Sequence, residues 1–217
     1  MSKAILILGE SGTGKSTSLR NLPPSETFIV NVLGKSLPFR GSRKNYTPLV
    51  KNEGNMYESD DYLRIKDCVL YVNSSRPEIK YLVIDDLGYT LQNDYLRKAS
   101  AKGYDKFTEM GKLFGELIES IRNLRDDLFV FVTMHVEIDA HGKTKPKTVG
   151  KMVDNHVVIE GRFTFVLHTL VIDNDYRFIT NHDGMHMAKT PMDMFPMTIP
   201  NDLMEVVKTI NAYEDGE

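Results

Sequence analysis

The feature that most constrains this 217-residue chain is a glycine-rich stretch that directly follows a short apolar run near its start. Residues 4–8 are all apolar and too few for a helix, which predicts a strand buried on both faces of a parallel sheet. The residues after it fit the pattern G-x-x-x-x-G-K-[ST], whereas a plain glycine turn has no need of the lysine and serine. The pattern predicts a phosphate-binding loop made of Gly9, Glu10, Ser11, Gly12, Thr13, Gly14, Lys15, Ser16 and Thr17.

The residue types of this loop match the chemistry of a nucleoside triphosphate. Glycine at positions 9, 12 and 14 lets the backbone wrap closely around an anion and adopt positive φ. Amide groups at the start of the helix that follows favour negative charge. Lys15 is expected to contact the β- and γ-phosphates, and the Ser16 hydroxyl is expected to bind Mg²⁺. The expected cofactors are therefore ATP and Mg²⁺, with other nucleoside triphosphates left open.

The composition limits the class of protein. A net charge of -3 gives no overall attraction to nucleic acid, although it leaves room for a local basic stripe. The single cysteine, Cys68, cannot form an internal disulfide, which indicates a reducing compartment. No apolar stretch approaches the roughly 20 residues of a membrane span. We therefore expect one α/β domain over residues 1–217, without membrane contact, in the cytoplasm, or in the host cytoplasm if the protein is phage-encoded.

Two further apolar runs end in polar residues that suit the same site. Residues 81–84 are closed by Asp85 and Asp86, and residues 128–134 are closed by His135. In a parallel sheet such strand ends meet at the carboxyl edge, beside the phosphate loop. Asp85 is therefore expected to hold Mg²⁺ opposite Ser16. His135 is expected near the γ-phosphate, either as a sensor or as an ordinary structural histidine.

The rest of the chain reads as alternating helices and strands with a hairpin near the end. A first helix is expected at residues 15–21, where prolines stop it, and a strand at 27–32. Apolar spacing predicts helices at 61–73 and 105–124. A long strand at 163–173, a turn, a strand at 176–180 and a capped closing helix from residue 201 or 202 follow. Residues 34–55 are expected to be irregular.

A lysine-rich segment at residues 136–151 follows the strand that ends at His135. Its acids are Glu137 and Asp139. Its basic residues are Lys143, Lys145, Lys147 and Lys151. Such a segment is either a solvated connection or a loop that binds phosphodiesters, because clustered lysines repel one another unless a polyanion or an acidic surface neutralises them. On the second interpretation single-stranded DNA is the expected partner.

With these parts in order, the sequence resembles the RecA-like ATPases, and more closely the short phage-encoded ATP-binding proteins of the Sak type, which are linked to single-strand annealing and recombination. The resemblance covers nearly the whole chain through residues 9–17, 27–39, 82–86, 133–137 and 188–191. It implies a P-loop NTPase with a RecA-like core, a mostly parallel central sheet flanked by helices, and a late β-hairpin. It also implies a homo-oligomer with ATP at subunit interfaces and a single-strand-binding or recombination protein as a partner.

The resemblance implies roles for single residues as well. The strand after the metal-binding strand carries a γ-phosphate sensor and starts a DNA-binding loop, here His135 and the lysine-rich segment. Lys189 looks like the family's lysine that reaches a neighbour's ATP, with a plain surface lysine as the alternative. The family's catalytic glutamate has no counterpart in residues 30–34. Asp86 is the first candidate to orient the attacking water and Glu137 the second, so hydrolysis is expected to be slow.

Three functions follow as hypotheses. The first is an ATPase that assembles on single-stranded DNA through residues 136–151. The second is a small-molecule phosphotransferase, for which Arg40 and Arg43 would supply a lid over the acceptor phosphate. The third is a nucleotide-switched module that binds a partner without hydrolysis.

Overall fold

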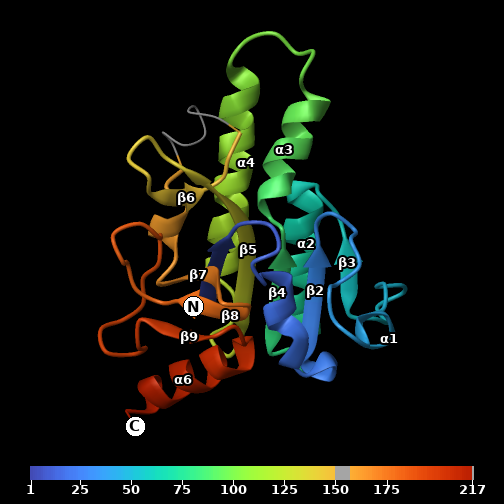
Figure 1. Ribbon diagram of the computed structural model, residues 1–217. Coiled ribbons are helices and arrows are strands. Elements are labelled where there is room, and N and C mark those ends of the chain that lie inside the picture. Colours follow the sequence, from blue (N-terminus) through green and yellow to red (C-terminus); the bar gives the residue numbers. More distant parts are fainter. Residues whose placement is uncertain (150–156, 217) are drawn as a thin grey trace.

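The computed structural model describes residues 1–149 and 157–216, so Lys151 lies outside the described residues (Figure 1). The strands are β1 (Lys3–Gly9), β2 (Thr27–Asn31), β3 (Met56–Glu58), β4 (Tyr81–Asp85), β5 (Phe129–Ile138), β6 (Thr144–Pro146), β7 (Phe165–Ile172), β8 (Asp175–Ile179) and β9 (Thr198–Pro200). The α-helices are α1 (Ser42–Asn45), α2 (Tyr62–Ser75), α3 (Gly88–Arg97), α4 (Asp105–Arg122) and α6 (Leu203–Asp215). Short 3₁₀-helices are η1 (Ser16–Asn21), η2 (Pro24–Glu26) and η3 (Glu160–Arg162).

One twisted sheet runs through the molecule in the order β3-β2-β4-β5-β1-β7-β8-β9. All pairs from β3 to β7 along this order are parallel, whereas β8 and β9 are antiparallel to their neighbours. The short β6 pairs antiparallel with the far end of β5. The chain is therefore an α/β protein with a mostly parallel central sheet, as the apolar runs predicted. None of the described helices is long and apolar enough to cross a bilayer.

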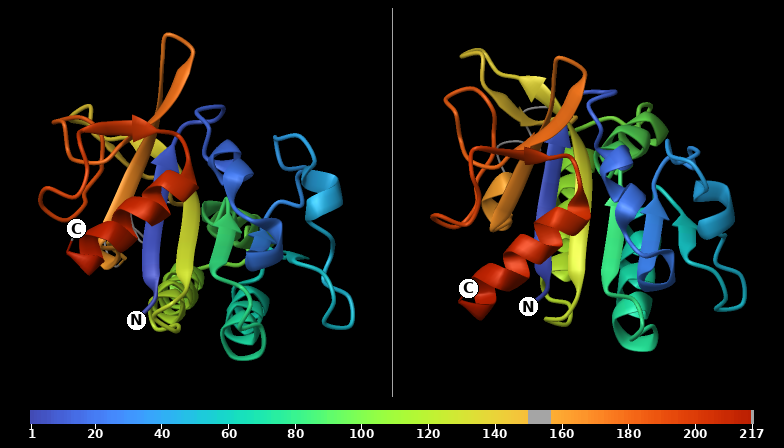
Figure 2. Two further views of the ribbon diagram at one scale, coloured as in Figure 1. Left: turned by 90° about the horizontal axis from the view of Figure 1, so that it is seen from below. Right: turned by 60° about the horizontal axis from the view of Figure 1, so that its bottom comes forward.

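Helices cover both faces of the sheet, and each face has its own core. On one face α2, α3 and α4 pack on a cluster that includes Leu6, Val130 and Ile84. On the other face η1 and α6 pack on a cluster that includes Ile7 and Phe131. Figure 2 shows α6 on the side of the sheet opposite α2 and α4. Because side chains alternate along a strand, each buried strand feeds both cores, which explains its continuous apolar sequence.

The first helix is a short 3₁₀-helix. Residues 16–21 form the six-residue 3₁₀-helix η1 instead of an α-helix, and Leu22 is already extended. Pro23 and Pro24 follow at once, and proline both removes a donor and restrains the residue before it. Too little chain remains for a full α-helix. The dipole of η1 is correspondingly small, so anion binding here depends on the loop's own amides and on Lys15.

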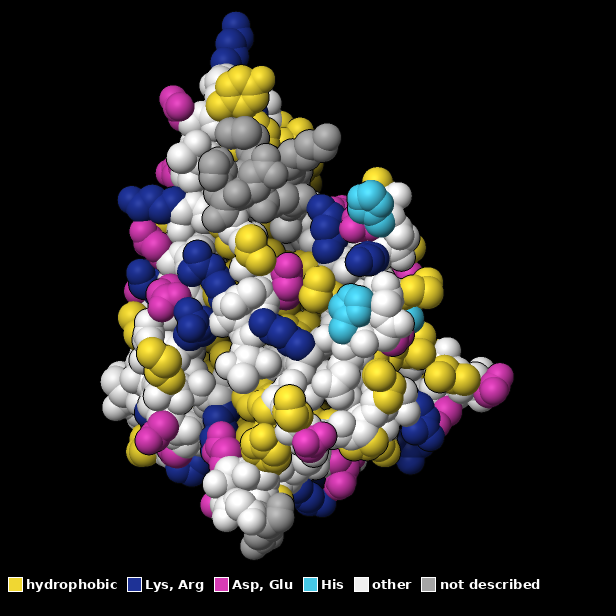
Figure 3. All heavy atoms as spheres, turned by 90° about the vertical axis from the view of Figure 1, so that its left-hand side faces the viewer, with side chains coloured by type: hydrophobic (Ala, Val, Ile, Leu, Met, Phe, Trp, Pro, Cys, Tyr) yellow, Lys and Arg dark blue, Asp and Glu magenta, His cyan; other side chains and the backbone are white. Residues whose placement is uncertain are grey.

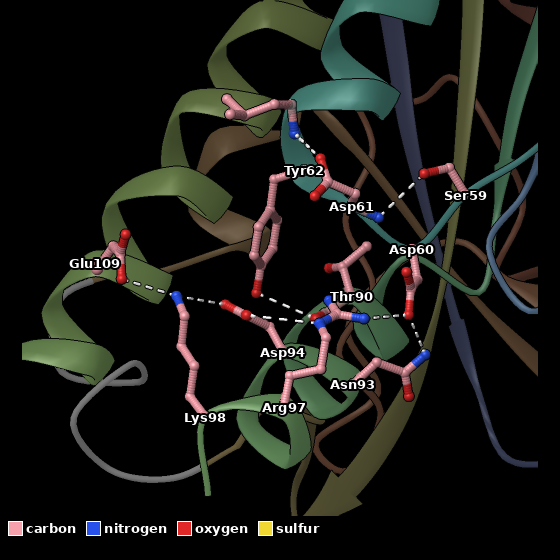
Figure 4. A network of polar contacts seen from close by, with 11 residues as sticks. Ser59, Asp60, Asp61, Tyr62, Thr90, Asn93, Asp94, Arg97, Lys98 and Glu109 are labelled. Carbon is pink, nitrogen blue, oxygen red and sulfur yellow. Dashed lines mark hydrogen bonds and ion pairs between the residues drawn. The ribbon is translucent and has the colours of Figure 1, made fainter. Parts of the chain in front are cut away.

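The helix α3 and the strands β3 and β6 were not predicted. The apolar face of α3 that meets the core is short. A polar network joins the C-terminal part of α3 to the residues before α2 and to α4 (Figure 4). Asp60, just before α2, accepts hydrogen bonds from Asn93 Nδ2 and Arg97 Nη1, both at 2.7 Å. Lys98 Nζ lies 3.2 Å from Asp94 and 2.8 Å from Glu109 of α4. These contacts between distant residues stabilise α3, and local apolar spacing does not reveal them.

The late hairpin was predicted, and the structure confirms it as β7 and β8. Its two connecting residues, Asp173 and Asn174, have φ of 49° and 63°. Positive φ at both positions is typical of the two-residue turn that matches the twist of antiparallel strands, and Asp and Asn tolerate it. The predicted closing helix is α6, capped by Asp202, which accepts from the Met204 amide.

The core gives a stability test. Phe114 of α4 is fully buried and meets Tyr62 edge-on at a centroid distance of 6.4 Å. Phe114→Ala should lower the free energy of unfolding in urea by about 3–5 kcal/mol, because it removes apolar contacts and leaves a cavity. Lys112→Ala, whose side chain is 73% exposed on the same helix, should change it by less than about 0.5 kcal/mol. Equal effects of the two variants would contradict the packing of α4 described here.

Candidate functional site

The polar groups of the candidate site lie on one face of the sheet, at its carboxyl edge. On five parallel strands the side chains toward η1 and α6 are apolar until the strand's last residues: Ile29, Val83, Phe131, Ile7 and Leu167 belong to that core. Two residues further along, on the same face, lie Asn31, Asp85, Thr133, Gly9 and Thr169. His135 follows Thr133 by two more. The alternation of strand side chains therefore gathers polar side chains from four strands at one place, beside the glycine that ends β1.

Asn31, Asp85 and His135 of this set line a cavity of about 270 Å³. Six of the residues 9–17 line it, together with four residues between positions 31 and 38. The remaining lining residues are Asp85, Asp86, His135 and Tyr176. The structure thus brings the predicted loop, the predicted metal carboxylate and the predicted sensor together in one cavity.

The glycines of the loop serve two different purposes. Gly12 and Gly14 have φ of 81° and 99°, as expected for a backbone that turns its amides toward an anion. Gly9 was also expected to need positive φ, and that expectation is wrong, because Gly9 is the last residue of β1 and is not in that region. A Cβ on Gly9 would instead clash with Thr169 Oγ1. Thr169 Oγ1 lies 2.5 Å from Thr13 Oγ1, so the small residue at position 9 lets β7 hold the loop.

Lys15 is buried beneath its own loop. Its ammonium donates to the carbonyl oxygens of Gly9 at 3.0 Å and Glu10 at 2.7 Å, and the residue is 6% exposed. Burial lowers the pKa of Lys15, while the nearby Asp86 and Asp85 oppose that effect. A buried cation with only carbonyl oxygens as hydrogen-bond partners has a strong tendency to bind an anion.

A second contact joins the loop to the strands β4 and β5. Ser16 Oγ donates to the Asp85 carboxylate, with distances of 3.0 and 2.8 Å to its two oxygens. Thr133 Oγ1 donates to Asp85 Oδ1 at 2.7 Å and accepts from the Asp86 amide at 2.7 Å. The carboxylate is therefore oriented from β5 and from η1 at the same time. Asp85 is 6% exposed, and burial first and Asp86 second raise its pKa to about 6.

Asp86 lies on the open side of this contact in a strained conformation. Its φ of 65° is in the left-handed region, which non-glycine residues adopt at a cost of about 1 kcal/mol or more and which clusters at functional sites. Its Oδ1 is buried without a hydrogen-bond partner in the described part of the chain, and lies 3.5 Å from His135 Nε2. Its Oδ2 lies 3.9 Å from Lys35 Nζ. An orphaned carboxylate oxygen of this kind can accept a proton or a hydrogen bond from a ligand or water.

His135 is held against Tyr89, with an edge-on ring contact of 5.6 Å between centroids. Burial, and then the Lys15 cation, lower the pKa of His135, while Asp86 opposes them. The imidazole is therefore neutral at pH 7, and its contact with Asp86 is not an ion pair there. A neutral imidazole at the cavity can donate one hydrogen bond and accept another.

The lysine-rich segment is more ordered than expected over its described part. Residues 136–138 extend β5 and pair with β6, so the segment begins as a hairpin. Lys145 Nζ lies 2.8 Å from Glu137 Oε1, so this acid neutralises one of the four lysines within the hairpin. Lys143 and Lys147 are exposed. Lys151 lies outside the described residues.

Two predicted residues are not brought to the cavity. Glu137 faces Lys145 and does not line the cavity. Lys189 is exposed and pairs through its backbone with Val166, near the start of β7 and away from the carboxyl edge. Within one subunit, only Asp86 of the two proposed water-orienting carboxylates lies at the cavity.

Several residues of this region were missed. Thr133 and Thr169 could have been found from strand alternation, since each follows an apolar residue by two positions at the carboxyl end. Lys35 adds a second cation to the cavity and also lies 5.3 Å above the Tyr89 ring. Tyr176 comes from the late hairpin, and no local pattern links it to the loop at residues 9–17.

Comparison of the chain with models of protein families finds no match, and comparison with curated proteins finds none either. Among residues 1–149 and 157–216, no group of three or more His, Cys, Asp or Glu side chains is arranged to hold a metal ion. A metal at this cavity would therefore need ligands from a hydroxyl or from a bound phosphate beside Asp85.

The pKa of Asp85 gives a prediction on stability. The carboxyl titrates near 3.8 when unfolded and near 6 when folded, so the folded state binds more protons between these values. The Asp85 contribution to stability is thus fully present below about pH 4 and is lost as the pH rises to about 6, by about 3 kcal/mol. Urea unfolding in the presence of a metal chelator measures this loss. Between pH 4 and pH 7 the free energy of unfolding of the wild type should fall by this amount more than that of Asp85→Asn, which has no carboxyl to titrate. Parallel pH profiles of the two proteins would contradict it.

Proposed function

We propose that this protein binds ATP with Mg²⁺ and hydrolyses it slowly, as a RecA-like P-loop ATPase that acts on single-stranded DNA in recombination or replication of the phage type. The observation that carries the proposal is the contact of Ser16 with the Asp85 carboxylate beside the buried Lys15 cation. A lysine and a hydroxyl from the loop after β1, together with a carboxylate from the end of β4, suit a metal-bound triphosphate.

The residues present fit a magnesium ion. Mg²⁺ prefers oxygen ligands and is usually held by one or two carboxylates together with substrate phosphates. Ser16 and Asp85 would hold it, and Asp85 is ionised at neutral pH because its pKa is about 6. When bound, the metal would neutralise charge on the β- and γ-phosphates. Thr133 orients the carboxylate, and the Lys15 ammonium would exchange its two carbonyl partners for phosphate oxygens.

Slow hydrolysis agrees with what the cavity offers to an attacking water. Asn31 ends β2, near where the resemblance implies a catalytic glutamate. Its side-chain Nδ2 donates to the Lys35 carbonyl at 2.7 Å. Asp86 is the carboxylate at the cavity with a free oxygen, and it is our candidate to orient water. Lys35 Nζ at 3.9 Å and His135 Nε2 at 3.5 Å lie on either side of this carboxylate and would help to position it.

The proposed DNA contact is the β5–β6 hairpin. Lys143 and Lys147 are exposed there, and the Lys147 amide donates to the His135 carbonyl at 2.8 Å. His135, beside the proposed γ-phosphate position, is thus joined through β5 and this backbone contact to the segment that carries the lysines, so a shift of one moves the other. On the face that bears β6, basic and acidic side chains are interspersed (Figure 3). Attraction for a polyanion is therefore local to these lysines.

The proposed assembly is a homo-oligomer with ATP at subunit interfaces. Lys189 lies outside the cavity of its own subunit and is exposed, so it would act on a neighbour's nucleotide if it acts on one at all. A single-strand-binding or recombination protein is the proposed partner, as the family resemblance implies.

The proposal predicts DNA-stimulated turnover that depends on Lys15. Lys15→Ala should lower ATP turnover by roughly 100-fold or more, because it removes the cation that stabilises charge on the transferred phosphate. Replacing Lys143 and Lys147 together by alanine should leave turnover without DNA unchanged. It should reduce the slope of log affinity for an oligonucleotide against log salt by roughly 1.4.

The matched control replaces Lys112 and Lys208, whose side chains are 73% and 66% exposed elsewhere on the surface, and should leave that slope unchanged. Absence of both DNA-stimulated turnover and salt-sensitive retention of single-stranded DNA would overturn the proposal. Tight ATP binding without turnover, with or without DNA, would favour a nucleotide-switched partner-binding module instead.

One observation favours a second candidate, a small-molecule phosphotransferase. A cavity of about 220 Å³ adjoins the first and shares Lys35 and Ser36 with it. Arg43 lines this second cavity and donates to Ser36 Oγ at 3.3 Å, whereas Arg40 does not line it. An acceptor with an anionic group would fit between Arg43 and Lys35. ADP release that requires a nucleoside monophosphate, and that Arg43→Ala abolishes, would favour this function over the first.

A further inference from the structure

Tyr176 lines the candidate nucleotide cavity from the side opposite the catalytic candidates. Along the sheet, Asp85 and His135 come from β4 and β5 on one side of β1, whereas Tyr176 comes from β8 on the other side. The loop that follows β1 lies between them. A triphosphate whose γ-phosphate is near Asp86 and His135 would therefore extend over the loop toward Tyr176.

The Tyr176 ring lies directly against the loop. A Cβ added to Gly14 would be 2.9 Å from Tyr176 Cδ1, so only glycine leaves room for the ring at this place. Tyr176 is 46% exposed, which leaves much of the residue accessible from the cavity. An aromatic ring with one side packed on backbone and the rest open is suited to stack on a planar ligand.

The backbone that carries this ring is connected to the loop by hydrogen bonds. The Tyr176 carbonyl accepts from the Asn201 amide at 3.1 Å, and Arg20 Nη1 donates to the Asn201 carbonyl at 2.6 Å and to Thr17 at 3.2 Å. The hairpin is thereby connected to η1, which begins at the end of the loop. The backbone at Tyr176 therefore requires little further ordering when a ligand binds.

A second feature at the same place points to a ligand with polar groups. The Asn201 side chain is beside Gly14, with its oxygen 3.1 Å and its nitrogen 3.2 Å from the position of an added Cβ. Both atoms are buried, and neither has a hydrogen-bond partner in the described part of the chain. Buried amides are normally paired, so an unpaired one beside the cavity leaves a donor and an acceptor for a bound group.

We infer that Tyr176 is the platform on which the base of the bound nucleoside triphosphate stacks, supplied by the subunit that also provides the phosphate loop. The inference rests on the proposed nucleotide-binding function, and it adds a contact for the base to the contacts proposed for the phosphates. The triphosphate is held by the loop and Lys15, whereas the base is held by Tyr176. Stacking is tolerant of base identity, because every base has a π-face. This contact therefore distinguishes a nucleotide from a bare triphosphate more than one base from another.

The test compares ATP with inorganic triphosphate, each with magnesium, by titration calorimetry, which suits a chain without tryptophan. Tyr176→Ala should weaken ATP binding roughly tenfold or more and leave the affinity for inorganic triphosphate unchanged, since only ATP has a base. Tyr176→Phe keeps the ring and should bind ATP like the wild type. Tyr104→Ala, at a 72% exposed tyrosine on the far end of the α3–α4 pair, is the matched control and should change neither affinity.

The outcomes distinguish a failure of the role given to Tyr176 from a failure of nucleotide binding itself. Equal weakening of ATP and inorganic triphosphate by Tyr176→Ala would mean that the ring shapes the loop, and would overturn the inference while leaving triphosphate binding intact. Unchanged ATP binding by Tyr176→Ala would also overturn it. If the wild type binds neither compound, the proposed function fails and the inference fails with it. Thermal unfolding of each variant shows that loss of binding is not loss of fold.

Discussion

The site depends on one buried carboxylate. Asp85 accepts hydrogen bonds from Ser16 and Thr133, so it connects the end of β4 with η1 and with β5. Removal of a carboxylate from water is costly unless hydrogen bonds or opposite charges replace the water. Two hydroxyls and the nearby Lys15 supply that replacement only in part, because the pKa of the carboxyl still rises to about 6. On the proposed function, a bound Mg²⁺ would supply the remaining stabilisation of this charge.

The position of that carboxylate follows from the sheet. β5 lies between β4 and β1, so a hydroxyl on β5 reaches the β4 carboxylate, and the loop after β1 reaches it from the far side. Parallel strands with alternating side chains bring all their carboxyl ends to one edge and one face. Polar residues placed there do not disturb either core, since the last apolar layer is two residues below. The fold can therefore hold several charged groups close together above a predominantly apolar core.

Much of the fold and part of the site could be predicted from the sequence, for a physical reason. The strands at residues 3–9, 81–85 and 129–138, the helix α4 and the hairpin β7–β8 have strong local patterns, and Gly12, Gly14, Lys15, Ser16 and Asp85 follow from one motif and one strand end. The helix expected at residues 15–21 is the short 3₁₀-helix η1, because two prolines directly after it limit its length. The pairing of Glu137 with Lys145, the contact of Thr13 with Thr169 and the place of Tyr176 depend on residues far apart or on tertiary register, which no short window contains.

The geometry also suggests how nucleotide and polyanion binding can be linked without a long pathway. The neutral His135 is on β5 between Asp86 and the lysine hairpin, and its carbonyl accepts from the Lys147 amide. A phosphate that draws Lys15 or Lys35 toward itself removes positive charge from beside Asp86 and His135, which alters the hydrogen bonding of both. Because β5 is paired with β1 as far as His135 and with β4 as far as Val132, a displacement beyond His135 is confined to the hairpin. The sheet thus confines the response to the segment that carries the exposed lysines.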